Sequence, residues 1–180
     1  MKLQLNMKIF VKQEVFDMGN VADYVKKYRD MGYTCAESTL LAADEAWNLN
    51  IPEGSSRFLA GFGGGLMCGD VCGAVSGGVA ALSYKYVRGD GHHSPLLTQK
   101  VSTFVKLVES RIGTKLCLEL RPMFLTEEEN CTPTVRAIAK ILDEVEAMEF
   151  DTPEHTDEDI RFSEAGKELL KSTMDYVEKY

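Results

Sequence analysis

The chain has 180 residues, of which 44% are hydrophobic and 27% are charged, and its net charge is −8. This length is sufficient for one domain with a sizeable core. The acidic balance argues against a nucleic-acid-binding face, and no apolar run approaches the roughly 18 residues that a membrane span requires. Because the first residues lack the apolar centre of a signal peptide, we expect a cytoplasmic protein without nucleic-acid or membrane partners.

The N-terminal residues 1–19 differ in pattern from the rest of the chain. Apolar and polar residues alternate from Leu3 to Val11, which is typical of a β-strand. A single strand has no partner within the monomer. We therefore predict an extended arm or strand that could pair across a homodimer.

Helical patterns begin after the arm. Apolar residues at helical spacing predict a helix over 21–31 that ends at Gly32. Thr34 and Glu37 have the form of a capping box, which predicts that the next helix begins there and continues to Asn48.

The remaining helices are predicted from the same apolar spacing. Ser94 and Pro95 are typical of a helix start, and Gly113 of a helix end. The predicted helices cover residues 55–60, 71–88, 94–112, 114–121, from Thr132 to at least Val145, and 157–180. We therefore predict an all-α, compact bundle of about six or seven helices. Its parts are the arm (1–19), a cysteine-containing redox domain (20–150) and a C-terminal helix packed on that domain (151–180).

Residues 61–78 hold eight of the fifteen glycines and two of the five cysteines. The run from Gly63 to Gly65 predicts a loop that leads into the helix over 71–88. Gly73, Gly77 and Gly78 lie inside this helix, where each costs roughly 1 kcal/mol relative to alanine. Such glycines indicate that another group comes very close, which could be a neighbouring helix or a bound cofactor.

The cysteines do not form a pattern typical of structural disulfides, because their number is odd and no export signal precedes them. Four of them lie at or near predicted helix starts, where a thiolate is favoured and its pKa is lowered: Cys35, Cys68, Cys72 and Cys131. Cys68 and Cys72 are four residues apart, so they would share one face if the helix begins early enough.

Several short motifs follow one another in a specific order: GYTCA from residue 32, GGG from 63, CGAVSG from 72, RIGTKLCLEL from 111 and CTPTV from 131. This order resembles the C_GCAxxG_C_C family of redox-active proteins over about residues 32–142. The resemblance places the family's four cysteines on Cys35, Cys72, Cys117 and Cys131, and Cys68 matches a cysteine found in many members. Such a domain is also similar to part of the split-Soret cytochromes, which carry an iron–sulfur centre. No C-x-x-C-H motif for haem attachment is present.

Three functions are consistent with these residues. The first is an iron–sulfur or other metal site used in electron transfer with a redox partner protein. Its candidate ligands are Cys35, Cys68, Cys72, Cys117 and Cys131, with Gly63, Gly64, Gly65, Gly73 and Gly77 beside the cofactor. The second is metal-free thiol–disulfide exchange, with Cys35 and Cys72 as the catalytic pair and a protein or small thiol as partner. The third is a non-catalytic helical module with buried structural cysteines.

Overall fold

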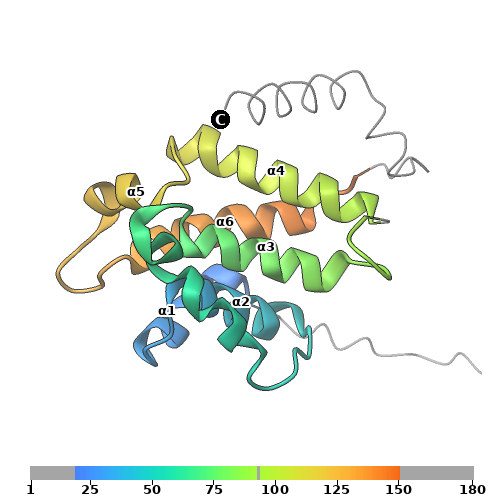
Figure 1. The fold of residues 1–180 in the computed structure, drawn as a ribbon, viewed down its shortest axis with the longest axis horizontal. Helices are drawn as coiled ribbons and strands as arrows, with labels where there is room; N and C mark the ends of the chain where they lie inside the picture. The colour runs from blue at the N-terminus through green and yellow to red at the C-terminus, as the bar shows by residue number, and fades with distance from the viewer. Residues whose placement is uncertain (1–18, 93, 151–180) are drawn as a thin grey trace, which may run out of the picture.

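The computed structural model of the chain describes residues 19–92 and 94–150 (Figure 1). Within these ranges the protein is all-α, with six α-helices, two short irregular helical segments and no strand longer than an isolated bridge. The predicted arm, except for Gly19, and the predicted C-terminal helix (151–180) lie outside the described residues. The predicted homodimer contact through the arm therefore stays a prediction. None of the helices in these ranges combines the length and apolar character needed to cross a bilayer.

The helices follow one another with short connections. Their bounds are α1 Val21–Asp30, α2 Cys35–Trp47, α3 Gly73–Tyr86, α4 Pro95–Ile112, α5 Cys117–Phe124 and α6 Thr132–Ala147. The two irregular segments are η1, a 3-10 helix over Ser55–Phe62, and η2, a π-type turn over Gly65–Gly69.

The core forms where α3 and α6 pack together. α4 covers one side of this pair, and α1 and α2 cover the other (Figure 1). Phe104 on α4, Leu82 on α3 and Ile138 and Leu142 on α6 are fully buried. The N-termini of four helices, α2, α3, α5 and α6, lie at the same end of the bundle.

Several predicted helix ends are confirmed. Thr34 and Glu37 form the capping box, since the Glu37 N–H donates to Thr34 Oγ1 at 3.3 Å and the Thr34 N–H donates to the Glu37 carboxylate at 3.0 Å. Gly113 ends α4 with a φ of 96°, a conformation that favours glycine. The capping box makes Cys35 the first residue of α2.

Close packing accounts for two glycines of α3. A Cβ on Gly77 would lie 2.3 Å from the Ala36 carbonyl oxygen, and one on Gly78 would lie 2.7 Å from the Phe104 ring. Both distances are far below a normal contact. Gly77 and Gly78 therefore let α2 and α4 approach α3, as the packing alternative predicts.

Three local predictions are wrong. α3 begins at Gly73 rather than at residue 71, because Val71 pairs with Leu116 in an isolated antiparallel bridge. α4 begins at Pro95 after Ser94 as predicted, but the Ser94 side chain does not cap it, since it donates to the Asp90 carbonyl and accepts from the Arg88 N–H. The short helix predicted over 114–121 is shifted and covers Cys117–Phe124.

Candidate functional site

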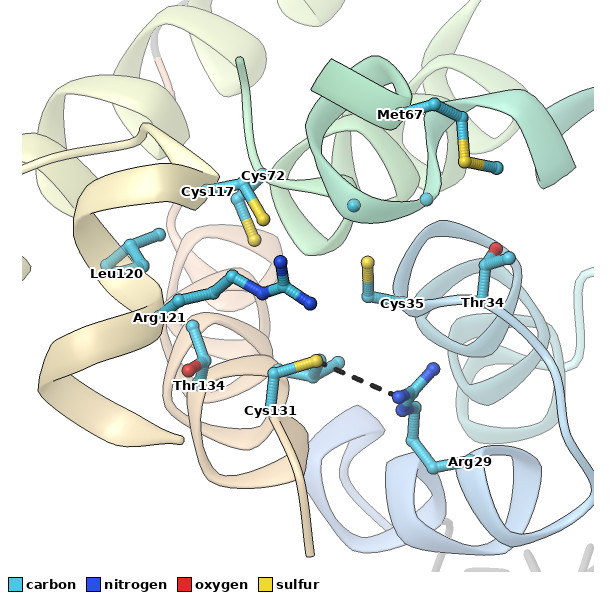
Figure 2. A pocket seen from close by; sticks show the side chains of 13 residues that line it. Arg29, Thr34, Cys35, Met67, Cys72, Cys117, Leu120, Arg121, Cys131 and Thr134 are labelled. Carbon is cyan, nitrogen blue, oxygen red and sulfur yellow. Dashed lines mark hydrogen bonds between the residues drawn. The ribbon is translucent and has the colours of Figure 1, made fainter. Parts of the chain in front are cut away.

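Four cysteines come together at the N-termini of four helices. Cys35 is the first residue of α2 and Cys117 the first of α5, while Cys72 and Cys131 directly precede α3 and α6. All four line one cavity of about 230 Å³, which we call the thiol cavity (Figure 2). The expectation that four cysteines lie at helix starts is therefore confirmed for Cys35, Cys72 and Cys131, whereas the remaining one is Cys117 and not Cys68.

Two backbone hydrogen bonds bring Cys72 and Cys117 to this cavity. The Cys72 N–H donates to the Lys115 carbonyl at 2.8 Å, and the Cys117 N–H donates to the Asp70 carbonyl at 2.7 Å. These bonds flank the bridge between residues 71 and 116, so α3 and α5 begin beside each other. The bridge joins segments far apart in the chain, and this is why helical spacing alone did not reveal it.

Gly73 brings Cys35 close to the start of α3. A Cβ on Gly73 would lie 2.5 Å from Cys35 Sγ and 2.8 Å from the Phe62 carbonyl oxygen. No larger residue fits without a shift of α2. Gly73 thus allows two thiol-bearing helix ends to meet.

The five glycines predicted beside a cofactor have different positions. Gly63 and Gly64 line the thiol cavity, and Gly64 has a φ of +62°. Gly65 lies beneath Cys117, where a Cβ would be 2.6 Å from the Cys117 Cβ and 2.3 Å from the Asp70 carbonyl oxygen. Gly65, like Gly73 and Gly77, is not among the residues that line the cavity, and a contact of any of these glycines with a cofactor stays a prediction.

Cys68 lies apart from the other four cysteines. It belongs to η2, is exposed, and its Sγ lies 3.5 Å from the Gly65 carbonyl oxygen. It does not line the thiol cavity. The prediction that Cys68 and Cys72 share one helix face is wrong, because α3 begins only at Gly73.

Burial keeps the inner thiols protonated. It raises the pKa of Cys72 to about 12, with a further contribution from the neighbouring Cys35, and it also raises the pKa of Cys117. The prediction that a helix start lowers the pKa is therefore wrong for Cys72, because the loss of hydration outweighs the helix N-terminus. In the absence of a cation, Cys72 and Cys117 are both neutral thiols at pH 7.

Three polar side chains of the cavity were not anticipated from the sequence. The guanidinium groups of Arg29 and Arg121 point into it (Figure 2), and Thr134 is also among its lining residues, with its hydroxyl oxygen buried. Arg29 donates to the Tyr33 carbonyl at 2.6 Å and to Cys131 Sγ at 3.7 Å. Both arginines lie in the last turn of their helices, where basic residues are common because they interact favourably with the helix dipole, so their sequence positions do not indicate a cavity.

The arrangement does not correspond to a preformed site for a single metal ion. Within residues 19–92 and 94–150, no three His, Cys, Asp or Glu side chains are grouped closely enough to hold one ion. All five cysteines are free thiols. The cavity therefore offers four sulfur atoms around a shared space.

Comparison with known proteins places the chain in one family. No curated protein and no solved structure shows a significant match. A family model described as "Putative redox-active protein (C_GCAxxG_C_C)" matches residues 33–145, which include the four cysteines of the thiol cavity. The chain therefore belongs to the C_GCAxxG_C_C family of redox-active proteins.

Proposed function

We propose that this redox-active protein transfers electrons through an iron–sulfur cluster held by the thiolates of Cys35, Cys72, Cys117 and Cys131. The observation that supports the proposal is that these four thiols, from four different helices, line a single cavity. Iron–sulfur clusters are commonly held by four cysteine thiolates. Separate apolar niches would have been expected if the cysteines served only for packing.

The residues present fit such a group in their donor chemistry. Soft thiolate ligands favour iron–sulfur clusters over ions that prefer oxygen. A cluster contains several metal atoms, so its ligands need not converge on one point as those of a single ion do. When bound, the cluster would supply reversible one-electron transfer, and its positive metal charge would displace the protons of the buried thiols.

The surrounding residues would support this role. Arg29 donates a hydrogen bond to Cys131 Sγ, and four helix N-termini face the cavity. Hydrogen bonds and positive charge beside the sulfur atoms favour the reduced, more negative state of a cluster. Gly64 both lines the cavity and is exposed, so a redox partner protein could approach closely there.

Metal-free thiol–disulfide exchange is the second candidate, because the cavity holds several free thiols at neighbouring helix starts. Cys35 and Cys72, the predicted catalytic pair, both line it. The raised pKa of Cys72 works against this candidate, because the thiolate is the nucleophile in exchange reactions.

The test is anaerobic purification and reconstitution with iron and sulfide, followed by iron and labile-sulfide analysis and an absorption spectrum. We expect the wild type to bind iron and sulfide together. The variants C35S, C72S, C117S and C131S should each lose most of both. C68S is the matched control and should retain them, because Cys68 lies outside the cavity.

Other outcomes would replace the proposal. Iron-free protein that loses two titratable thiols on oxidation and regains them on reduction would favour thiol–disulfide exchange. Iron-free protein whose cavity thiols do not react would favour buried structural cysteines.

A further inference from the structure

Arg29 lines the thiol cavity and, among the polar side chains that the structure describes, is the one that donates a hydrogen bond to a cavity sulfur atom. We propose that Arg29 is a positioning residue, which holds Cys131 at the cavity, ties it to the segment that leads to Cys35, and raises the reduction potential of a cluster bound there. The effect on the potential rests on the proposed function, whereas the hold on Cys131 can be tested without metal.

Backbone structure fixes the other three thiols of the cavity. Cys35 follows the capping box of α2, and Cys72 and Cys117 are joined by the two backbone hydrogen bonds beside the 71–116 bridge. All three are at most 8% exposed, whereas Cys131 is half-buried and follows the loop that precedes α6. We therefore expect Cys131 to depend more than the others on a side-chain contact that fixes its sulfur atom.

The guanidinium group of Arg29 reaches two segments at once (Figure 2). Its Nη1 donates to the Tyr33 carbonyl at 2.6 Å, and its Nη2 donates to Cys131 Sγ at 3.7 Å. Tyr33 directly precedes Thr34, the N-cap of α2, so the two bonds join the start of α2 to the start of α6. A guanidinium can span two acceptors in this way, because its N–H donors form a planar fork of fixed geometry.

The helix that carries Arg29 is itself fixed to α6. At the first turn of α1, the N–H groups of Val21 and Ala22 donate to the Asp143 carboxylate at 2.9 and 3.2 Å, and Val21 is fully buried. Arg29 lies in the last turn of the same helix. Residues that orient a ligand act best from a rigid element, so α1 is suited to hold Cys131 in place.

The charge of Arg29 forms no ion pair with a carboxylate within residues 19–92 and 94–150. A sulfur atom that ligates a cluster carries negative charge, and hydrogen bonds to charged groups are roughly twice as strong as neutral ones. Because reduction adds negative charge to the cluster and its ligands, the bond to Cys131 should be stronger in the reduced state and should raise the reduction potential.

Arg121 offers a contrast at the same cavity. Its guanidinium also points into the cavity (Figure 2), but the residue is exposed, and its side chain makes no hydrogen bond or ion pair within the described ranges. Water and salt screen an exposed charge, so its influence on the cluster should be smaller than that of Arg29.

The first experiment is a double-mutant cycle on the reduced, metal-free full-length chain, measured by urea denaturation. R29Q should lower the urea midpoint of the wild type, but clearly less in the C131A background, where the sulfur atom is absent. R121Q is the matched control and should have the same effect in both backgrounds. An effect of R29Q that is equal in both backgrounds would show that Arg29 does not hold Cys131, and would overturn the proposal.

The second experiment measures the reduction potential of the reconstituted protein by anaerobic redox titration. R29Q should make the equilibrium constant for reduction roughly tenfold smaller, which corresponds to about 59 mV for one electron. R29K keeps the charge and should recover most of this shift, whereas R121Q should cause a smaller one. Equal potentials of R29Q and the wild type, or equal shifts from R29Q and R121Q, would overturn the proposal. Wild-type protein that binds no iron and sulfide would contradict the proposed function and the effect on the potential together, while the metal-free cycle would still decide whether Arg29 holds Cys131.

Discussion

At the C-terminal end of α6, the ammonium group of Lys100 donates hydrogen bonds to three carbonyl oxygens at 2.6 to 2.8 Å. At the N-terminal end of the same helix, the Thr134 hydroxyl and Arg29 Nε have no acceptor. Lys100 is 3% exposed, so both ends contain buried polar groups, but only one of them is fully paired.

This difference between the two ends of α6 separates a role in stability from a role in function. A cation that satisfies the last carbonyl groups of a helix closes that end and stabilises the fold. An end that gathers four thiols around a cavity leaves groups available to a ligand. The C-terminal end of α6 should therefore be sensitive in unfolding experiments, and its N-terminal end in binding experiments.

The largest effect on stability is expected at the C-terminal end of α6, where Lys100 pairs with carbonyl groups. K100M would remove the Lys100 donor from three buried or half-buried carbonyl groups, of which two keep only a long hydrogen bond, of 3.3 and 3.5 Å, from another donor, and we expect a loss of about 3 kcal/mol in the free energy of unfolding. Urea denaturation measures this loss. K106M, at an exposed position on the same helix, is the control and should change little. A loss below about 1 kcal/mol for K100M would show that the hydrogen bonds of Lys100 at the C-terminal end of α6 do not stabilise the fold as described.

A smaller loss in the free energy of unfolding is expected from G73A, at the start of α3 beside Cys35. The added Cβ would press on Cys35 Sγ and on the Phe62 carbonyl oxygen, which should cost about 1 to 3 kcal/mol and displace Cys35. Urea denaturation gives the cost, and iron content after reconstitution reports the displacement. G61A is the matched control, because a Cβ there meets no atom within 4 Å. Equal stability and equal iron content for the two variants would contradict the close approach of α2 and α3.

The smallest effect is a pH dependence of the metal-free protein. The pKa of Cys72 is raised from its ordinary value of 9.0 to about 12, so between these values the unfolded chain loses a proton that the folded chain keeps. The contribution of Cys72 to the free energy of unfolding should therefore fall as the pH rises above 9, by at most about 1.4 kcal/mol per pH unit, and should be nearly constant at lower pH. Unfolding at pH 8 and pH 10 measures the fall. C72S should reduce it and C68S should not; an identical fall in C72S would rule out Cys72 as its source.

Signals confined to one helical turn were predictable from the sequence. The Thr34 capping box and the Gly113 stop depend only on nearby residues, and both are confirmed. The start of α3 was misplaced, because Val71 continues the apolar spacing of that helix but pairs with Leu116. This long-range pairing also explains why Cys117, and not Cys68, joins the other cysteines at a helix start.

The candidate site was predictable only in part. Helix-start positions predicted three of the four thiols that line the cavity and wrongly added Cys68, whereas Cys117 came only from the family resemblance. The positions of Arg29, Arg121 and Thr134 at the cavity depend on how α1, α5 and α6 meet, and the local sequence around each residue carries no signal of this. Tertiary packing creates this part of the site, so spacing along the chain cannot show it.

X-ray absorption at the iron edge of the reconstituted protein tests most directly whether the four thiols act together. The account predicts a first shell of sulfur atoms only, iron–iron scattering, and an unchanged spectrum in C68S. Oxygen or nitrogen ligands in the first shell, a single isolated iron, or a spectrum altered by C68S would contradict it.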